Sequence, residues 1–320
     1  MKKFVDLKAR FSGVHDLIKF RVTEILLIST AYDGFVLEED GQLTEQLYHQ
    51  FNDLSIPFIP RIHRVTTQEE AFTELIARPI HLILTMSRIS DMGAFVIEKA
   101  IYAAYPAIPI IMLSYDRLTP EMIAHIRGIP CINRVFHWSG DSKILLAIIK
   151  YVEDQKNVEA DSKLGVQAIL LVEDSPIYYS QILPIIYTEI LTQTRYLVLH
   201  AMNASHGLLR VRLRPKILLA ETYEEAMDTI LTYRHNLLGV ISDVRFPKDG
   251  MLNPTAGFDL AQRVREMITD FPFLLQSEEL ENAEKAYAMD VHFLNKNSPN
   301  LLHDLRTFIM ENYGFGAFVF

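Results

Sequence analysis

Four apolar runs of this chain end on side chains that together could bind a divalent cation and a phosphoryl group. One run leads directly into Glu173 and Asp174, and another ends on Asp243. The remaining two end on the hydroxyl of Ser277 and the ammonium of Lys296. In an open parallel sheet the carboxyl ends of the strands share one edge, where such folds place their ligands. Hard cations prefer carboxylate oxygens, so the set indicates a cation and phosphoryl site.

A weak internal repeat organises the elements that must position these residues. The matching segments are 24–30 with 169–174, 67–71 with 222–226, 81–86 with 239–243, 108–114 with 271–277, and 133–137 with 292–296. Thr67 and Thr222 are expected helix N-caps, with Glu70 and Glu225 completing capping boxes. Short apolar runs that alternate with helical segments predict parallel strands covered on both faces. Each half is therefore expected to be a five-stranded, doubly wound α/β domain.

The domain boundary is expected in the charged segment 153–163, which reads as a linker. This gives one domain over residues 1–155 and another over residues 164–320. A chain of 320 residues has room for two such domains.

The composition favours a cytoplasmic protein that binds neither nucleic acid nor membrane. A net charge of −9 disfavours phosphate-backbone contacts, and no apolar signal peptide begins the chain. The longest hydrophobic region, 94–113, contains charged residues and prolines. This composition fits a buried helix followed by a strand better than a membrane span. The single cysteine, Cys131, is expected to fill core.

The second half resembles a receiver domain of two-component signalling, a flavodoxin-like (CheY-like) fold, over nearly all of residues 164–312. The resemblance implies that Glu173, Asp174 and Asp243 bind Mg²⁺, with the backbone carbonyl of Arg245 as a further ligand. Asp243 would be the phosphoacceptor. A sensor histidine kinase or phosphotransfer protein would be the donor.

The same resemblance implies roles for three further residues. Lys296 would neutralise charge on the transferring group, Ser277 would bind the phosphoryl group, and Phe293 would be the switch aromatic. Two residues depart from the family pattern: Glu278 stands where a small residue is usual, and Asn297 where a proline is usual. The loop 246–256 is also longer than is typical.

The first half resembles a receiver domain that lacks the metal-binding and phosphoacceptor residues. Ser29 and Thr30 replace the acidic pair, Met86 replaces the phosphoacceptor, and His137 stands near the lysine position. Such a set cannot bind Mg²⁺ in the receiver manner, so this half is expected to be a pseudo-receiver that makes contacts.

The segment 176–214 predicts an extended helix with a heptad pattern. The seam positions are Leu183, Ile190, Leu197, Ala204 and Val211, with Tyr187, Thr194, Ala201 and Leu208 four residues after each. This pattern favours packing on a partner helix, in a homodimer or on the first half, or a helix that covers its own domain. Arg214 and Lys216 are expected to form part of a solvated basic helix end.

Two alternatives to a phosphorylated receiver come from other functional classes. One is a scaffold in which neither half is phosphorylated, which Glu278 favours. The other is an aspartate-nucleophile phosphatase, which Arg245 disfavours because such enzymes usually carry a second aspartate there. More weakly, the layout is similar to regulatory regions ahead of phosphoenolpyruvate synthase and pyruvate phosphate dikinase-like modules. The apolar tail 313–320 likewise suggests a further C-terminal output module.

Overall fold

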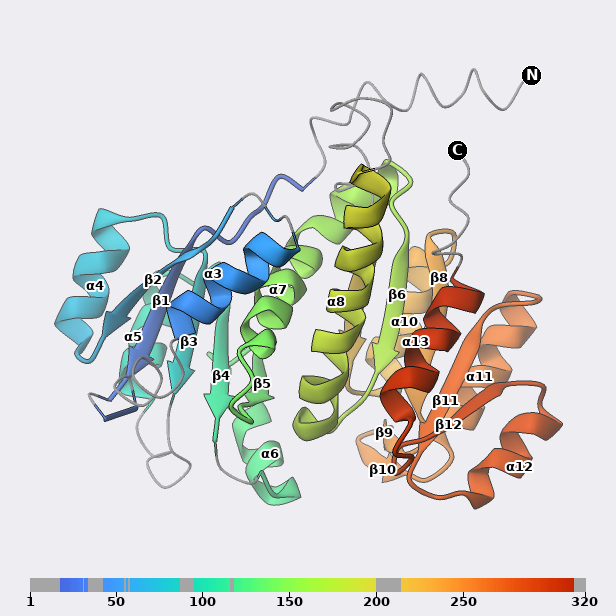
Figure 1. Ribbon diagram of the computed structural model, residues 1–320. Helices are drawn as coiled ribbons and strands as arrows, with labels where there is room; N and C mark the ends of the chain where they lie inside the picture. Colours follow the sequence, from blue (N-terminus) through green and yellow to red (C-terminus); the bar gives the residue numbers. More distant parts are fainter. Residues whose placement is uncertain are drawn as a thin grey trace. The chain divides into compact units, whose positions relative to one another are not determined.

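In a computed structural model, the chain forms two compact units, each built on its own five-stranded parallel sheet (Figure 1). The structure describes residues 18–30, 32–33, 43–54, 56, 58–86, 95–115, 118–199 and 214–313. The first unit comprises Phe20–Glu153 and Pro176–Pro184. The second comprises Asp154–Ser175 and the described residues from Ile185 onward.

The first unit alternates strands and helices along the chain. Its elements are β1 (Glu24–Ser29), α3 (Leu43–Asp53), β2 (Arg61–Val65), α4 (Gln68–Ala77), β3 (Leu82–Met86), α5 (Val96–Ala104), β4 (Ile110–Ser114), α6 (Pro120–Arg127), β5 (Arg134–His137) and the start of α7 (Lys143–Lys163). Side chains of α4, α5 and α6 pack with one face of the sheet in a single apolar cluster, which includes Cys131 as expected. The other face is covered by α3 and α7 (Figure 1).

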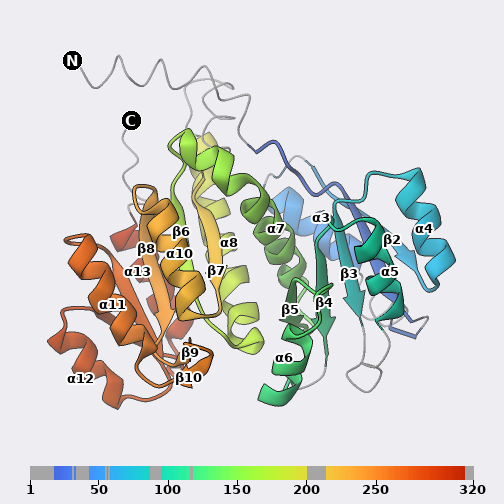
Figure 2. The same cartoon turned by 180° about the vertical axis from the view of Figure 1, so that it is seen from behind.

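The second unit repeats this alternation, with one insertion after its third strand. Its elements are β6 (Ala168–Val172), the part of α8 (Pro176–Leu199) from Ile185 onward, β7 (Lys216–Ala220), α10 (Tyr223–Tyr233), β8 (Leu237–Asp243), β9 (Phe246–Lys248), β10 (Met251–Asn253), α11 (Ala256–Met267), β11 (Phe273–Ser277), α12 (Glu281–Ala288), β12 (His292–Asn295) and α13 (Leu301–Asn312). One face of the sheet packs against α10, α11 and α12. The other faces α8 and α13 (Figures 1 and 2).

Both sheets have the same strand order, and this order defines the fold. The first sheet runs β2-β1-β3-β4-β5, and the second runs β7-β6-β8-β11-β12, which is the same 2-1-3-4-5 order. All strand pairs in both sheets are parallel. This is the flavodoxin-like arrangement, in which ligands bind where the strand order reverses. The prediction of two doubly wound α/β domains is confirmed.

The repeat between the halves extends to the helix caps. The Thr67 side chain accepts a hydrogen bond from the backbone of Glu70, whose carboxylate closes a capping box. Thr222 accepts in the same way from Glu225, and the Glu225 carboxylate accepts from the backbone N–H of Glu221. Both predicted N-caps are therefore confirmed.

The charged segment 153–163 is not a linker of irregular structure; it is the second half of helix α7. Asp154, Asn157, Val158 and Asp161 recur at helical spacing and are all buried. The boundary between the two units does fall within this helix, after Glu153. The sequence interpretation failed because the partners of these charges lie about sixty residues away in the chain.

Those partners are Arg214 and Lys216, which were predicted to form part of a solvated helix end. Arg214 donates to both carboxylate oxygens of Asp154, at 2.6 and 3.0 Å. Lys216 forms an ion pair with Asp161 at 2.8 Å, and burial is the main cause that lowers the pKa of its ammonium. Both basic side chains are buried, so the expectation of a solvated basic end was wrong.

Asp154→Asn is expected to lower the free energy of unfolding by about 3 kcal/mol, because it removes one of the two carboxylates that neutralise the buried side chains of Arg214 and Lys216. Urea denaturation measures the change in this free energy. The matched control is Glu159→Gln on the same helix, whose pair with Lys163 is exposed and should change stability by well under 1 kcal/mol. Equal effects of the two changes would contradict a buried ionic network.

Helix α8 is described as far as Leu199, so the predicted extension to Arg214 lies partly outside the described residues. Within it, the seam positions Leu183, Tyr187, Ile190 and Thr194 are all buried in the single chain. Tyr187 donates to Asp154 in the second unit. The Tyr187 contact lies within the second unit and favours the alternative in which the helix covers its own domain. Packing on a partner helix, in a homodimer or on the first half, stays a prediction. No helix in the described part of the chain is long and apolar enough to span a membrane.

Candidate functional site

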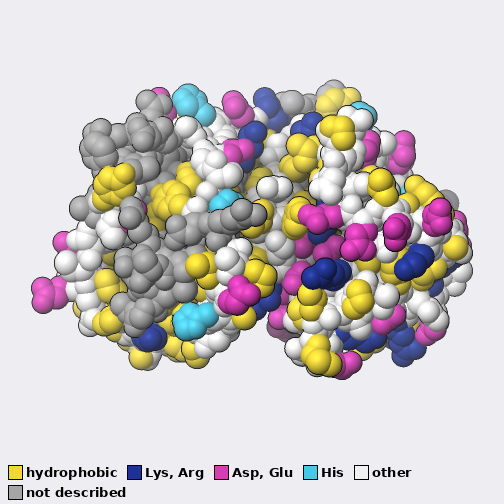
Figure 3. All heavy atoms as spheres, turned by 90° about the horizontal axis from the view of Figure 1, so that it is seen from below, with side chains coloured by type: hydrophobic (Ala, Val, Ile, Leu, Met, Phe, Trp, Pro, Cys, Tyr) yellow, Lys and Arg dark blue, Asp and Glu magenta, His cyan; other side chains and the backbone are white. Residues whose placement is uncertain are grey.

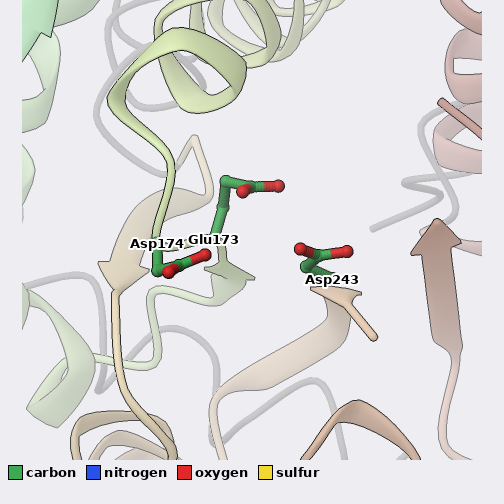
Figure 4. Close-up of side chains that lie close together, drawn as sticks. All are labelled: Glu173, Asp174 and Asp243. Atoms are coloured by element: carbon green, nitrogen blue, oxygen red, sulfur yellow. The ribbon is translucent and has the colours of Figure 1, made fainter. Parts of the chain in front are cut away.

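The three predicted carboxylates lie together at the carboxyl edge of the second sheet. Glu173 and Asp174 follow β6, and Asp243 is the last residue of β8 (Figure 4). Each offers an oxygen within 4.8 Å of the others. Within the described residues, no other set of three His, Cys, Asp or Glu side chains meets this condition. Figure 3 shows the molecule from this edge, where acidic side chains gather with basic ones among them.

The Lys296 ammonium lies between two of these carboxylates. Its Nζ is 2.6 Å from Glu173 Oε2 and 3.1 Å from Asp243 Oδ2. The Lys296 side chain is 2% exposed and that of Glu173 1%, whereas that of Asp243 is 14% exposed. Asp243 is thus the carboxylate of this pair that a reactant can reach. One ammonium cannot balance three carboxylates, so the charge and oxygen donors present fit a divalent cation.

Burial sets the protonation of the site. It raises the pKa of Glu173 to about 8, with Lys296 opposing the shift and Asp243 adding to it. Burial also raises the pKa of Asp243, again against the opposing effect of Lys296. For Lys296, burial alone would lower the pKa, but the two carboxylates outweigh it and leave that pKa raised. The buried site therefore favours the protonated form of Glu173 more than water does, unless a further positive charge enters it.

Mg²⁺ affinity is expected to rise with pH up to about 8 and then level off, because the cation must displace the Glu173 proton. The free energy of unfolding should instead fall as pH rises, because the folded metal-free protein binds this proton more tightly than the unfolded chain does. Its contribution to stability is thus complete below the ordinary pKa of Glu and is lost as pH rises towards about 8. Calorimetric titrations and thermal melts between pH 5.5 and 9 test both trends. A Mg²⁺ affinity independent of pH would contradict the prediction.

Close packing fixes the loop that follows Asp243. The Val244 N–H donates to Asp243 Oδ1 at 2.8 Å, and the Val244 carbonyl accepts from Gly257 N at 2.9 Å. A Cβ on Gly257 would clash with the Asp243 carbonyl and lie 2.8 Å from Val244 Cα. Only glycine lets α11 begin this close to the site. Arg245 follows with an exposed side chain, and its carbonyl stays a predicted metal ligand.

The long loop 246–256 contains an antiparallel hairpin formed by β9 and β10. Phe246 anchors it in the core, and Lys248 pairs with Asp259 of α11 at 2.6 Å. The Asp249 N–H donates to Glu224 at the start of α10. The extra length of this loop is thus an ordered insertion beside the acidic site.

The Ser277 hydroxyl is bonded to the start of the following helix. Its Oγ accepts from Glu279 N at 3.1 Å and from Asn282 Nδ2 at 3.0 Å. Both bonds use lone pairs of the hydroxyl oxygen, so Ser277 can still donate its O–H proton to a phosphoryl oxygen. Sequence reasoning missed Asn282, although a polar residue on the buried face of a short helix was a detectable signal. Phe293 packs against the core cluster, on strand β12 beside Leu275.

The two departures from the receiver pattern have simple local consequences. The Asn297 N–H donates to Asn295 Oδ1 at 2.7 Å, and the Lys296 N–H donates to the Ser277 carbonyl at 2.8 Å. These bonds shape the lysine loop in the absence of a proline. Glu278 is exposed, so its side chain lies at the surface rather than in the acidic cluster.

The corresponding edge of the first sheet has a different chemistry. Ser29 is paired in register with Met86, and the Tyr115 hydroxyl lies 3.7 Å from the Met86 sulfur. The acidic residue Asp33 accepts a hydrogen bond from Thr30 at 2.6 Å. Among the residues described in this unit, no carboxylate trio marks a metal site.

No family model matches the sequence, and no curated protein matches it. Among solved structures, the chain is similar to the signal receiver domain of an HD-domain protein from Pseudomonas fluorescens Pf-5, with 20% identity, 44% of this chain and 94% of that chain covered, and a TM-score of 0.30. A two-component response regulator/GGDEF domain protein matches with 14% identity, 90% and 98% coverage, and a TM-score of 0.34.

The Escherichia coli RcsC C-terminus, which contains a linker region and a phosphoreceiver domain, matches with 15% identity, 89% and 91% coverage, and a TM-score of 0.28. These structural neighbours are thus proteins with signal receiver or response regulator domains. The fold assignment of this chain rests on its own strand order.

Proposed function

We propose that the second unit is a Mg²⁺-dependent phosphoacceptor in a phosphorelay, with Asp243 as the phosphorylated residue. The observation that carries the proposal is the acidic cluster of Glu173, Asp174 and Asp243 with the Lys296 ammonium at 2.6–3.1 Å from two of its members. The phosphodonor is the phosphohistidine of a histidine kinase or phosphotransfer protein, or a small acyl phosphate that transfers the same phosphoryl group.

Each side chain has a role that follows from its contacts. An Asp243 carboxylate oxygen attacks the phosphorus, the bond from phosphorus to the donor breaks, and the donor leaves with that electron pair. Lys296 balances negative charge on the transferring group from its buried position. Glu173 and Asp174, with Asp243, would hold Mg²⁺, which supplies positive charge opposite the phosphoryl oxygens. Val244 N orients the Asp243 carboxylate.

The first unit serves as a contact module in this proposal. Its sheet edge offers Ser29, Met86 and His137 in place of the carboxylates and the lysine. These groups supply neither hard-cation ligands in a cluster nor an acidic nucleophile.

Intact-protein mass after incubation with Mg²⁺ and acetyl phosphate tests the proposal. One phosphate-sized gain that requires Mg²⁺ is expected. No gain with acetyl phosphate or phosphoramidate, in a protein that is folded and binds Mg²⁺, would contradict it.

A phosphorylation-independent interaction scaffold is the second candidate. It is favoured by Glu278, an exposed carboxylate that follows Ser277 where the receiver pattern has a small residue. In that case both units bind partners, and the acidic cluster affects stability only.

Glu278→Ala is expected to raise the phosphorylation rate with acetyl phosphate several-fold, because it removes an exposed negative charge next to Ser277 that repels the anionic donor. The gain should shrink as salt screens the repulsion. Glu281→Ala, a change of the same type in α12, is the control. A rate unaffected by Glu278→Ala at low salt would show that this carboxylate does not limit access.

A further inference from the structure

One polar side chain beside the site has no hydrogen-bond partner within the described part of the chain. Gln276 of β11 is 1% exposed, and neither its amide nitrogen nor its amide oxygen has a hydrogen-bond partner among the described residues. It follows three buried apolar residues of the same strand, Phe273, Leu274 and Leu275. A buried amide without partners is costly and calls for a physical explanation.

The strand register places Gln276 directly beside the phosphoacceptor. It is paired with Asp243 on β8 and with Leu294 on β12. Neighbouring strands are about 4.8 Å apart, and side chains of paired residues leave the sheet on the same face. The Gln276 carboxamide therefore starts one strand away from the Asp243 carboxylate, on the same side of the sheet.

The path of the Lys296 side chain also runs past this residue. Lys296 follows β12, whereas the Asp243 carboxylate that its ammonium contacts is on β8. Strand β11 lies between these two strands. The lysine must reach across the end of β11, where Gln276 is the last residue but one.

The electrostatics of the site change when a cation binds. Lys296 is hydrogen-bonded to Glu173 and close to Asp243. A divalent cation bound by these carboxylates would compete with Lys296 for the same oxygens. The ammonium has three N–H donors, each of which needs an acceptor. A buried carboxamide oxygen on the strand that the lysine crosses is an acceptor suited to one of them.

We propose that Gln276 is a positioning residue for Lys296 in the loaded site. Its carboxamide oxygen accepts a hydrogen bond from the ammonium once a cation and a phosphoryl group occupy the carboxylates, and so keeps the ammonium directed at the transferring group. This role rests on the proposed function and adds Gln276 to the residues that would carry it. This bond would give the buried carboxamide the partner that it lacks among the described residues.

Gln276→Met tests this, because it preserves length and volume and removes both polar atoms. Three quantities are measured on the full chain: the Mg²⁺ dissociation constant, the urea midpoint without metal, and the rate of mass gain with acetyl phosphate and saturating Mg²⁺. We expect an unchanged or raised urea midpoint, an Mg²⁺ affinity within about twofold of the native protein, and a rate lowered about tenfold or more, as for the loss of one charge-assisted hydrogen bond.

Leu274→Met is the matched control, since Leu274 is equally buried on the same strand and face. It should leave the phosphorylation rate unchanged. A native rate in Gln276→Met would overturn the inference, as would equal slowing in both variants or a parallel loss of Mg²⁺ affinity, because these outcomes indicate packing alone. A native protein that binds Mg²⁺ but is never phosphorylated would instead refute the proposed function, and the positioning role with it.

Discussion

Asp243→Asn is expected to abolish the phosphate-sized mass gain while leaving the protein folded. The amide is nearly isosteric with the carboxylate, and its oxygen can still accept the Val244 N–H that orients Asp243 at 2.8 Å. It has no anionic oxygen for attack on phosphorus, so the covalent step has no nucleophile. The expected loss exceeds about a thousandfold in rate, which corresponds to no detectable product.

The same change should also weaken Mg²⁺ binding, because one of the three clustered carboxylates is lost. In the metal-free protein it should instead be neutral or stabilising, since it removes a charge whose proximity raises the pKa of Glu173. Intact mass, calorimetric Mg²⁺ titration and urea denaturation measure the three effects.

Asp249→Asn is the matched control for Asp243→Asn. Asp249 lies in the hairpin after the same strand, is exposed, and has a positive φ of 53°, which asparagine tolerates. This variant should be phosphorylated at the native rate. If Asp243→Asn still gained one phosphate, another residue would be the acceptor and the proposed function would be wrong.

Lys296→Met should destabilise the metal-free protein by about 3 kcal/mol, because it removes the cation paired with two buried carboxylates. The cost should be greatest above pH 8, where Glu173 would otherwise be ionised. It should be smaller at pH 6, where the proton on Glu173 removes one of the unpaired charges. Urea denaturation at the two pH values measures the difference.

Mg²⁺ should recover much of the stability that Lys296→Met loses, because the cation takes over the neutralisation of the carboxylates. Phosphorylation should still be slowed about a hundredfold, since Lys296 balances the charge of the transferring group. Lys248→Met is the control: its pair with Asp259 is partly exposed, so it should cost less than about 1 kcal/mol. A Lys296→Met protein that Mg²⁺ fails to stabilise would contradict the shared charge balance.

The sequence by itself determined the elements and the edge at which chemistry is possible. Alternating apolar runs and helical segments predicted both sheets, because strands buried on two faces have to be continuously apolar. Thr67 and Thr222 were identifiable as caps because capping depends on residues only three positions apart. The convergence of Glu173, Asp174, Asp243 and Lys296 followed from the rule that parallel strands end at one edge.

Only the tertiary structure decided which charges are buried and which polar groups have partners. The segment 153–163 looks like a solvated linker until Arg214 and Lys216 reach it from a distant part of the chain. The sequence equally could not show that Ser277 accepts a hydrogen bond from Asn282, or that the buried amide of Gln276 has no partner among the described residues. Hydrogen bonds and desolvation depend on neighbours in space, whereas caps and strand periodicity depend on neighbours in the chain, and this difference separates what could be predicted from what had to be seen.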